Sequence, residues 1–244
     1  MRRSLIVLAA ALFACAGART ATAQDAAATD STVGLIDLGY VQTSGNTDVQ
    51  TVTGRERIEH YTGAWTFAQE LTAVQGETSD IETTARYTGL LRGGYDLSER
   101  IGLYLQGQWR REPYAGLSRQ FDEGFGVILH AVRPNPHEID LESGLGMLQR
   151  TQTSGLEEDF ATARFAARYR YHFTDKAIAS ARGEYLMNLE DTGDGELHAV
   201  FGVLAPITSG ISMRLSYDVY TRTQPAAGFE RTDTTFDTGV QISF

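Results

Sequence analysis

The chain has 244 residues, of which 42% are hydrophobic and 10% aromatic, and its formal net charge is −10. An acidic balance of this size argues against a nucleic-acid-binding protein, because such proteins present clustered positive charge to phosphates. No stretch contains the roughly 18 consecutive apolar residues that a membrane-spanning helix needs, which excludes a helical membrane protein.

The first residues have the features of an export signal. Met1–Ser4 carries two arginines, Leu5–Ala16 is apolar, and Ala21-Thr22-Ala23 matches an A-x-A cleavage signature. We therefore expect residues 1–23 to be removed on export.

The rest of the chain divides into a short polar segment, residues 24–31, and one folded domain, residues 32–244. A second interpretation makes Leu12–Cys15 a lipoprotein cleavage site, although Phe13 is large for its position in such a site. Because Cys15 is the one cysteine, a chain cleaved after residue 23 must be stable in an oxidising compartment without disulfides.

From residue 32 onward the hydrophobic pattern has a period of two, which is the period of β-strands. In Ile101–Trp109 the odd positions are apolar or small, whereas Gln106 and Gln108 fall on the opposite face. The same alternation recurs in Ala161–Phe173, Leu197–Ile207 and Ile211–Val219. Turn residues divide the domain into about twelve such segments of about 10 to 14 residues, long enough for a tilted strand to cross a bilayer.

The predicted turns alternate between two kinds. Tight turns are expected at residues 61–63, 98–100, 133–136, 174–176 and 208–210. Longer polar loops are expected at residues 44–47, 75–80, 112–119, 152–158, 190–195 and 224–230. Short periplasmic turns opposite longer outer loops are typical of outer-membrane barrels. The pattern thus predicts an all-β fold, a transmembrane antiparallel up-and-down β-barrel of about twelve strands; a soluble β-sandwich is the alternative.

The last segment has the features of a barrel's final strand. Phe236, Val240, Ile242 and the last residue, Phe244, are apolar at a period of two. Such an ending is similar to the signal that the barrel-assembly machinery reads, so we expect that machinery to be a partner. The barrel would lie in the cell outer membrane, in contact with its lipid and lipopolysaccharide, with outward-facing residues at Leu103, Phe165, Phe201 and Leu215.

The run Gly39–Asp48, with the pattern G-Y-x-x-T-S-G-N-T, resembles the opening of the YdiY-like family of salt-induced outer-membrane proteins. Glycine-aromatic segments such as Gly93-Gly94-Tyr95 and Phe125-Gly126 are similar too. The resemblance implies an outer-membrane barrel and a link to salt or osmotic stress, and it supplies no catalytic residues. Ser44–Thr47 also has the composition of a tight turn.

The polar face of the strands is rich in arginine, since twenty of the 21 basic residues are Arg and only Lys176 is Lys. We expect acidic and basic side chains on adjacent antiparallel strands to form a ladder inside the barrel. The candidate interior residues are Arg86, Arg110, Glu138, Asp140, Glu142, Arg164, Arg168, Arg170, His172, Arg182 and Arg214. Two interpretations follow: a narrow channel for small or anionic solutes such as acidic oligosaccharides, or a closed structural or surface-interaction barrel filled by ion pairs.

An enzyme is the weakest interpretation. His137-Glu138 begins like a zinc-protease helix motif, but the second His is missing and the segment alternates like a strand. His198 with Glu196 is the best candidate for a catalytic pair, although an interior hydrogen bond explains it better. Asp191–Glu196 is acidic but does not match the spacing of a calcium-binding loop. We expect no cofactor, no metal and no enzymatic activity.

Overall fold

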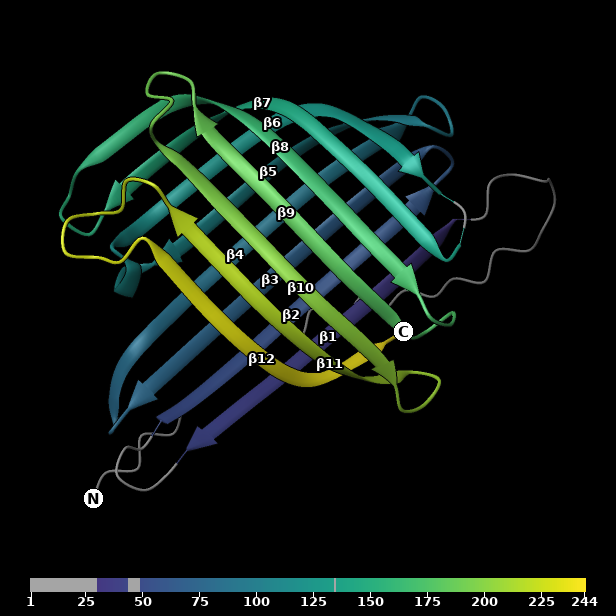
Figure 1. The fold of residues 1–244 in the computed structure, drawn as a ribbon, viewed down its shortest axis with the longest axis horizontal. Coiled ribbons are helices and arrows are strands. Elements are labelled where there is room, and N and C mark those ends of the chain that lie inside the picture. Colours follow the sequence, from purple (N-terminus) through teal and green to yellow (C-terminus); the bar gives the residue numbers. More distant parts are fainter. Residues whose placement is uncertain (1–29, 44–48, 134) are drawn as a thin grey trace.

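The computed structural model describes residues 30–43, 49–133 and 135–244, and nearly all of them lie in β-strands (Figure 1). The expected export signal, most of the segment 24–31 and the turn at 44–47 fall outside the described residues. The strands are β1 (Ser31–Thr43), β2 (Val49–Thr62), β3 (Trp65–Thr78), β4 (Ile81–Asp96), β5 (Ile101–Glu112), β6 (Leu117–Val132), β7 (His137–Gln152), β8 (Glu157–His172), β9 (Ile178–Asn188), β10 (Gly195–Pro206), β11 (Ile211–Arg222) and β12 (Thr232–Ser243).

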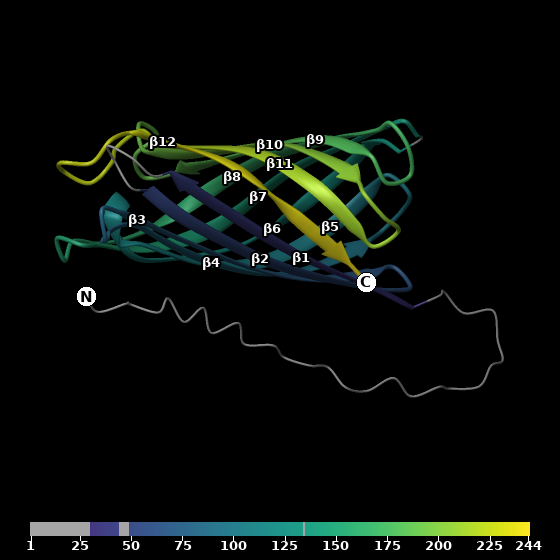
Figure 2. The same cartoon turned by 90° about the horizontal axis from the view of Figure 1, so that it is seen from below.

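The strands form one closed barrel in which each strand pairs antiparallel with its neighbours in the chain, and β1 pairs with β12. Figures 1 and 2 show the strongly tilted strands wrapping around a common axis. The only helix among the described residues is the 3-10 turn η1 (Pro113–Ala115), and no helix there is long and apolar enough to cross a membrane. The predicted up-and-down barrel is therefore confirmed.

The predicted tight turns match the connections at one end of the barrel, where residues 63–64, 97–100, 133–136, 173–177 and 207–210 join the strands. We call this the turn end, and the opposite end the loop end.

The prediction was wrong for the loop at 75–80. There β3 and β4 leave only Ser79 and Asp80 between them, with φ of 52° and 63°. Positive φ at both residues is the geometry of a two-residue hairpin turn. The strands extend past the expected membrane region, so polar strand residues were mistaken for a loop.

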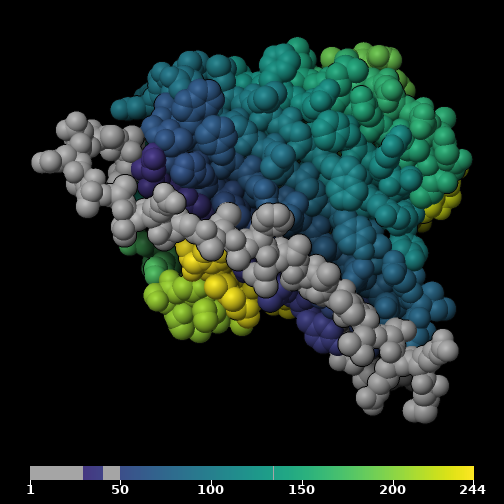
Figure 3. Space-filling model, turned by 180° about the vertical axis from the view of Figure 1, so that it is seen from behind, coloured from purple at the N-terminus to yellow at the C-terminus, as the bar shows by residue number. Residues whose placement is uncertain are grey.

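Large apolar side chains cover the outside of the barrel. Leu103, Phe165, Phe201 and Leu215 are 41%, 49%, 53% and 41% exposed, respectively. Seen from behind, the side chains of the strands form a closely packed outer layer (Figure 3). An apolar exterior of this kind is the surface that a bilayer's hydrocarbon requires.

Aromatic side chains gather at both ends of this apolar surface. At the turn end, the rings of Trp65 and Tyr95 lie 4.7 Å apart between centroids. At the loop end, Trp109 of β5 lies opposite Phe121 of β6 in the sheet register, and both are exposed. Two such rows correspond to the aromatic girdles that flank the hydrocarbon layer around membrane barrels.

The seam between the first and last strands is held by few residues. β1 and β12 pair only over Leu35–Gly39 and Gly239–Ser243. At the turn end, Phe244 and Gly34 exchange two backbone hydrogen bonds of 2.9 and 3.0 Å. The Phe244 ring lies on Gly34, where a Cβ atom would be 2.4 Å from the ring. The C-terminal residue therefore closes the barrel at this end.

Candidate functional site

The inward face of the barrel carries charged side chains of both signs at alternate strand positions. Every inward-facing arginine among the described residues lies within 4.0 Å of a carboxylate oxygen. These are Arg55, Arg57, Arg86, Arg92, Arg110, Arg150, Arg164, Arg168, Arg170, Arg182, Arg214 and Arg222. The interior is thus a network of ion pairs rather than a track of uncompensated positive charge.

The expected ladder between β7 and β8 is part of this network. Glu138 lies opposite Arg170 in the register and forms an ion pair with it. Asp140 lies opposite Arg168, with 3.6 Å between its Oδ2 and the arginine Nε. His172 Nε2 is 3.1 Å from Glu138 Oε1. The structure thus brings together five of the residues proposed from sequence along one wall.

Tyr104 of β5 is the centre of a second group. The Tyr104 side chain packs directly on two glycines. A Cβ atom on Gly126 would lie 2.8 Å from the Tyr104 ring, and a Cβ atom on Gly144 would lie 2.3 Å from the Tyr104 hydroxyl. The guanidinium of Arg92 lies 4.3 Å from the ring centroid, and Arg164 Nη1 donates to the hydroxyl at 3.0 Å. Tyr104 therefore fills the space that the missing side chains leave.

Two carboxylates complete this group, which we call the Tyr104 cluster: Arg92, Tyr104, Glu142, Arg164 and Glu184. Glu142 accepts from Arg92 at 2.9 Å and from Arg164 at 2.7 Å, and Glu184 accepts from Arg164 at 2.6 Å. The cluster joins β4, β5, β7, β8 and β9. On the same strands, Leu148 of β7, Phe160 of β8 and Leu186 of β9 pack as a small apolar core. This side of the interior is filled.

A third group crosses the barrel near its loop end. Glu196 of β10 accepts from Arg110 of β5 at 2.8 Å and from Arg150 of β7 at 3.3 Å, and its Oε1 is 3.3 Å from Arg222 Nε of β11. Arg110 also donates to Tyr220 of β11, with its guanidinium 4.3 Å from the ring centroid. Because β5 and β11 are six strands apart in the ring, these side chains meet from opposite walls.

We call these residues, together with Gln120, which donates to Glu196 at 3.2 Å, the Glu196 cluster. Glu196 is only 6% exposed, and Arg150 and Arg222 are 3% and 5% exposed. A carboxylate engaged by three guanidinium groups with this little exposure leaves little room between the two walls near the loop end. The Glu196 cluster is therefore a cross-barrel closure.

Loop residues cover the loop end above that closure. The connection 223–231, between β11 and β12, reaches the turn that follows η1. A Cβ on Gly116, whose φ is +77°, would lie 2.8 Å from both Ala226 and the Phe229 ring. Leu117 and Ala226 are 0% and 6% exposed. Since these segments come from distant strands, the connection spans the mouth at the loop end.

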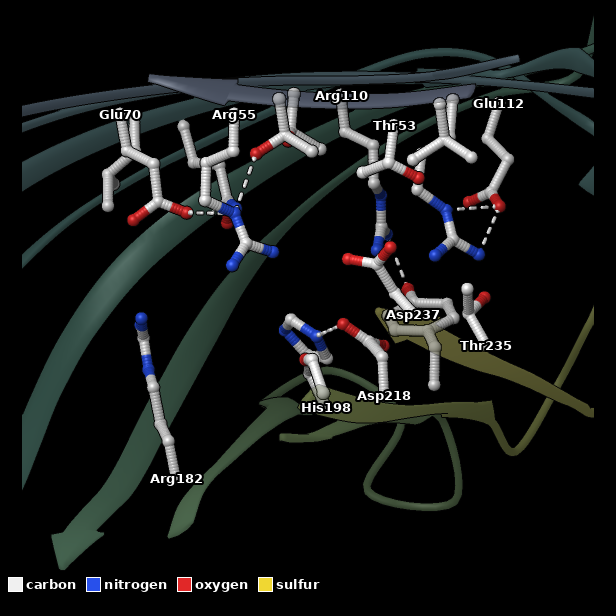
Figure 4. A pocket seen from close by; sticks show the side chains of 18 of the residues that line it. Thr53, Arg55, Glu70, Arg110, Glu112, Arg182, His198, Asp218, Thr235 and Asp237 are labelled. Carbon is white, nitrogen blue, oxygen red and sulfur yellow. Dashed lines mark hydrogen bonds and ion pairs between the residues drawn. The ribbon is translucent and has the colours of Figure 1, made fainter. Parts of the chain in front are cut away.

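A cavity of about 120 Å³ remains between strands β2–β5 on one wall and β9–β12 on the other. Figure 4 shows Arg55, Arg110 and Glu112 facing Arg182, His198 and Asp218 across this space. The cavity lining includes four arginines and five acidic residues. They are Arg55, Arg86, Arg110, Arg182, Glu70, Glu112, Glu184, Asp218 and Asp237.

The remaining residues proposed from sequence lie in or beside this cavity. Arg86 Nη2 is 2.5 Å from Glu112 Oε1, and Arg182 donates to Glu184 at 3.1 Å. Arg214 pairs with Asp237 and lies 3.3 Å from Asp37 Oδ1 of β1. The proposed residues therefore divide between the β7–β8 ladder, the two clusters and the cavity wall.

Sequence reasoning missed Tyr104, Arg150, Arg222 and Asp37 as interior residues, and considered Glu196 only together with His198, as an interior hydrogen-bond pair or, less favoured, a catalytic pair. A signal for Tyr104 was present. The repeats Gly124-x-Gly126 and Gly144-x-Gly146 place glycines on the inward face, which indicates that a large side chain from elsewhere packs there.

The candidate catalytic pair separates in the structure. His198 Nε2 lies 3.1 Å from Asp218 Oδ2, while Glu196 is engaged by arginines. In the acidic loop, Asp191 accepts from Gly193 N at 3.0 Å and from Gln224 at 2.9 Å. Among the described residues, no three His, Cys, Asp or Glu side chains are grouped so that they could hold a metal ion.

A closed up-and-down barrel with an apolar exterior and a charged, ion-paired interior has the architecture of outer-membrane β-barrel proteins. The family model described as "Protein of unknown function, DUF481" matches residues 36–244, and the chain belongs to this family.

Solved structures share the fold. The COG4313 outer membrane channel from Pseudomonas putida F1 is 11% identical with a TM-score of 0.55, over 92% of this chain and 100% of that chain. The NanC porin is 9% identical with a TM-score of 0.47, over 86% of this chain and 97% of that chain. No curated protein matches the chain. The first of these structures supports the barrel fold.

Proposed function

We propose that this protein is an outer-membrane barrel whose interior cavity forms part of a narrow passage for small polar solutes. The cavity between strands β2–β5 and β9–β12 is the observation that carries this proposal. It lies inside a closed barrel with an apolar exterior, so its polar lining is shielded from lipid. Paired charges keep such a lining wetted without binding one ion tightly.

The proposed solute follows from the charges that line the cavity. Four arginines face five carboxylates, and each of these arginines has a carboxylate partner. A lining with compensated charge favours small neutral or zwitterionic solutes over the acidic oligosaccharides suggested by the arginine content alone.

The location in the outer membrane rests on three features together: the export signal, the exposed apolar belt and the aromatic rows. Lipid and lipopolysaccharide would contact the belt, and the barrel-assembly machinery would recognise the strand ending at Phe244. The proposed link to salt or osmotic stress rests on the sequence resemblance alone.

Single-channel recording tests the passage. The refolded protein, confirmed as a folded barrel by a heat-dependent gel shift, is placed in a planar bilayer under a salt gradient. We expect small, brief current steps with a reversal potential close to zero, because the lining charges compensate each other. A strong anion preference would instead support transport of acidic solutes.

A closed structural barrel is the second candidate, and the Glu196 cluster favours it. Side chains from opposite walls meet there, and a covered mouth lies above them. Absence of current from a correctly folded barrel would support this candidate. The outer loops would then carry the function. Enzymatic activity is not proposed, because His198 pairs with Asp218 within the described interior.

A further inference from the structure

The four arginines that line the interior cavity differ in how firmly they are paired. Arg86 and Arg110 donate hydrogen bonds of 2.6 and 2.8 Å to carboxylates, and their side chains are 18% and 12% exposed. Arg55 and Arg182 have side chains that are 26% and 38% exposed. The cavity therefore offers two arginines whose guanidinium groups are more accessible than those of the other two.

Arg55 of β2 uses only one of its three nitrogens for its contacts. Its Nε atom lies 3.4 Å from the Thr72 hydroxyl and 3.7 Å from Glu70 Oε1, and the second distance is too long for a hydrogen bond. Glu70 accepts instead from Arg57, at 3.1 Å. Figure 4 shows the two terminal nitrogens of Arg55 pointing into the cavity. They are available to a ligand there.

Arg182 of β9 extends from the opposite wall toward the strands that carry Arg55 (Figure 4). It donates to Glu184 at 3.1 Å, but Arg164 donates to the same oxygen at 2.6 Å. In the sheet register Arg182 also lies directly opposite Arg168 of β8. Like charges in that position destabilise a sheet. An anion bound at Arg182 would offset this repulsion.

Asp218 of β11 is the acidic counterpart of these two arginines. Of the five acidic residues that line the cavity, it is the one with no arginine nitrogen within 4.0 Å in the part of the chain that the structure describes. Its Oδ2 lies 3.1 Å from His198 Nε2. A neutral imidazole satisfies a hydrogen bond but does not cancel the charge of a carboxylate. Asp218 therefore leaves a negative charge on the cavity wall.

The volume of the cavity limits the size of a ligand. The cavity measures about 120 Å³. A cavity of about 150 Å³ in another protein holds benzene, so this space suits a ligand of about six non-hydrogen atoms. Such a ligand would meet available cationic groups and an available carboxylate within one small space.

We propose that the cavity binds a small amino-acid-like zwitterion, with its carboxylate between Arg55 and Arg182 and its ammonium group at Asp218. This proposal rests on the proposed function and names the solute class of the passage. A guanidinium group binds a carboxylate through charge-assisted hydrogen bonds, and Asp218 would replace the water around the ammonium group. A ligand that carries only one of the two charges would satisfy only one side of the site.

Binding of alanine to the refolded protein tests the site, measured by saturation-transfer NMR in detergent micelles. Two analogues of similar shape are compared with it: isobutyrate, which lacks the ammonium group, and alaninamide, which lacks the carboxylate. We expect alanine to bind at least about tenfold more tightly than either, because each loses a charge-assisted interaction. Equal affinity for the three ligands would overturn the proposal.

Two variants assign the ends of the ligand. Arg182→Gln leaves Glu184 paired with Arg164, and Asp218→Asn keeps a hydrogen-bonding group beside His198, so both should fold. We expect Arg182→Gln to weaken alanine and isobutyrate about tenfold but not alaninamide, and Asp218→Asn to weaken alanine and alaninamide but not isobutyrate.

The control for both variants is Arg119→Gln, whose side chain is 69% exposed at the loop end; it should bind all three ligands normally. The heat-dependent gel shift confirms that each variant is folded. Unchanged binding in both cavity variants, or an equal loss for all three ligands, would overturn the site. Conductance separates this proposal from the passage. Alanine binding without current would refute the passage and keep the site, whereas current without alanine binding would refute the site and keep the passage.

Discussion

Individual carboxylates hold the interior together by serving several arginines each. Glu196 contacts Arg110, Arg150 and Arg222, and Glu142 contacts Arg92 and Arg164. In such an arrangement, removal of one acid takes a partner from several buried cations at once. Without Glu196, Arg110 and Arg222 lose the carboxylate with which they pair. Arg150 keeps Glu158 and Asp194. Removing the carboxylate destabilises the barrel by more than the ion pairs stabilised it, because each cation has already been taken out of water.

Glu196→Gln tests this asymmetry. The substitution keeps the shape of the side chain but leaves three nearly buried guanidinium groups without their shared charge, so we expect destabilisation of about 3 kcal/mol or more. Urea unfolding in lipid vesicles, followed by tryptophan fluorescence, measures it. The control is Glu157→Gln, whose carboxylate is 70% exposed and 3.6 Å from Arg119. Exposed pairs contribute about 0 to 1 kcal/mol. Equal stability of both variants would contradict the role given to Glu196.

Gly144 also matters for the stability of the barrel, because its surroundings leave no space for a side chain. A Cβ atom at this position would lie 2.3 Å from the Tyr104 hydroxyl and 2.4 Å from a backbone oxygen of Phe125. Gly144→Ala should therefore destabilise the barrel by about 1 to 3 kcal/mol, in the range of overpacked cores. The matched control is Gly183→Ala, where a Cβ would meet nothing within 4 Å. The same unfolding assay compares them, and a neutral Gly144→Ala would mean that Tyr104 readily moves aside.

Each strand presents one face to lipid and the other to the interior, which makes the effect of a charge depend on the face that carries it. Phe165→Arg and Phe201→Arg place a cation on the outward face near the middle of β8 and β10, where we expect about 2 to 4 kcal/mol of destabilisation near the bilayer midplane. Gln108→Arg adds the same charge to the cavity lining and should have a smaller effect. The heat-dependent gel shift reports the folded fraction of each variant. Normal folding of both outward variants would refute the membrane-facing assignment.

Strand count, order and facing could be predicted from sequence, because the period of two and the turn residues are local signals. Leu103 and Phe165 were placed outward by alternation alone, and the Glu138–Arg170 pair followed from the adjacency of two strands. The contact of Arg110 with Glu196 could not be predicted in this way. It depends on side-chain reach across the barrel, which no pattern within one strand encodes.

The short ladder between β1 and β12 was missed for a related reason. Strand alternation continues through Thr232–Thr238, so the sequence gives no sign that the ladder with β1 has ended. Whether two strands stay paired at the seam depends on the stagger and closure of the whole barrel rather than on local composition. The short turn at Ser79-Asp80 shows the opposite error, because local polarity suggested a loop where cross-strand pairing holds the strands together.

Two layers obstruct the axial path through the molecule at its loop end. The connection 223–231 covers the mouth, and the Glu196 cluster lies inside the barrel. If both layers limit the flow of ions, opening one of them should have a small effect as long as the other stays in place. Conductance of combined variants can therefore separate their contributions.

The test removes residues 225–229 and combines this deletion with Glu196→Gln. We expect each change alone to raise single-channel conductance less than twofold, and the combination to raise it by more than the product of the two, because obstructions in series limit flow together. Replacement of Ser79-Asp80, the two-residue turn between β3 and β4, by Asn-Gly is the control and should leave conductance unchanged. Full conductance from the loop deletion alone would show that the Glu196 cluster does not obstruct ions. The charged interior would then be a permeable lining beneath a single lid.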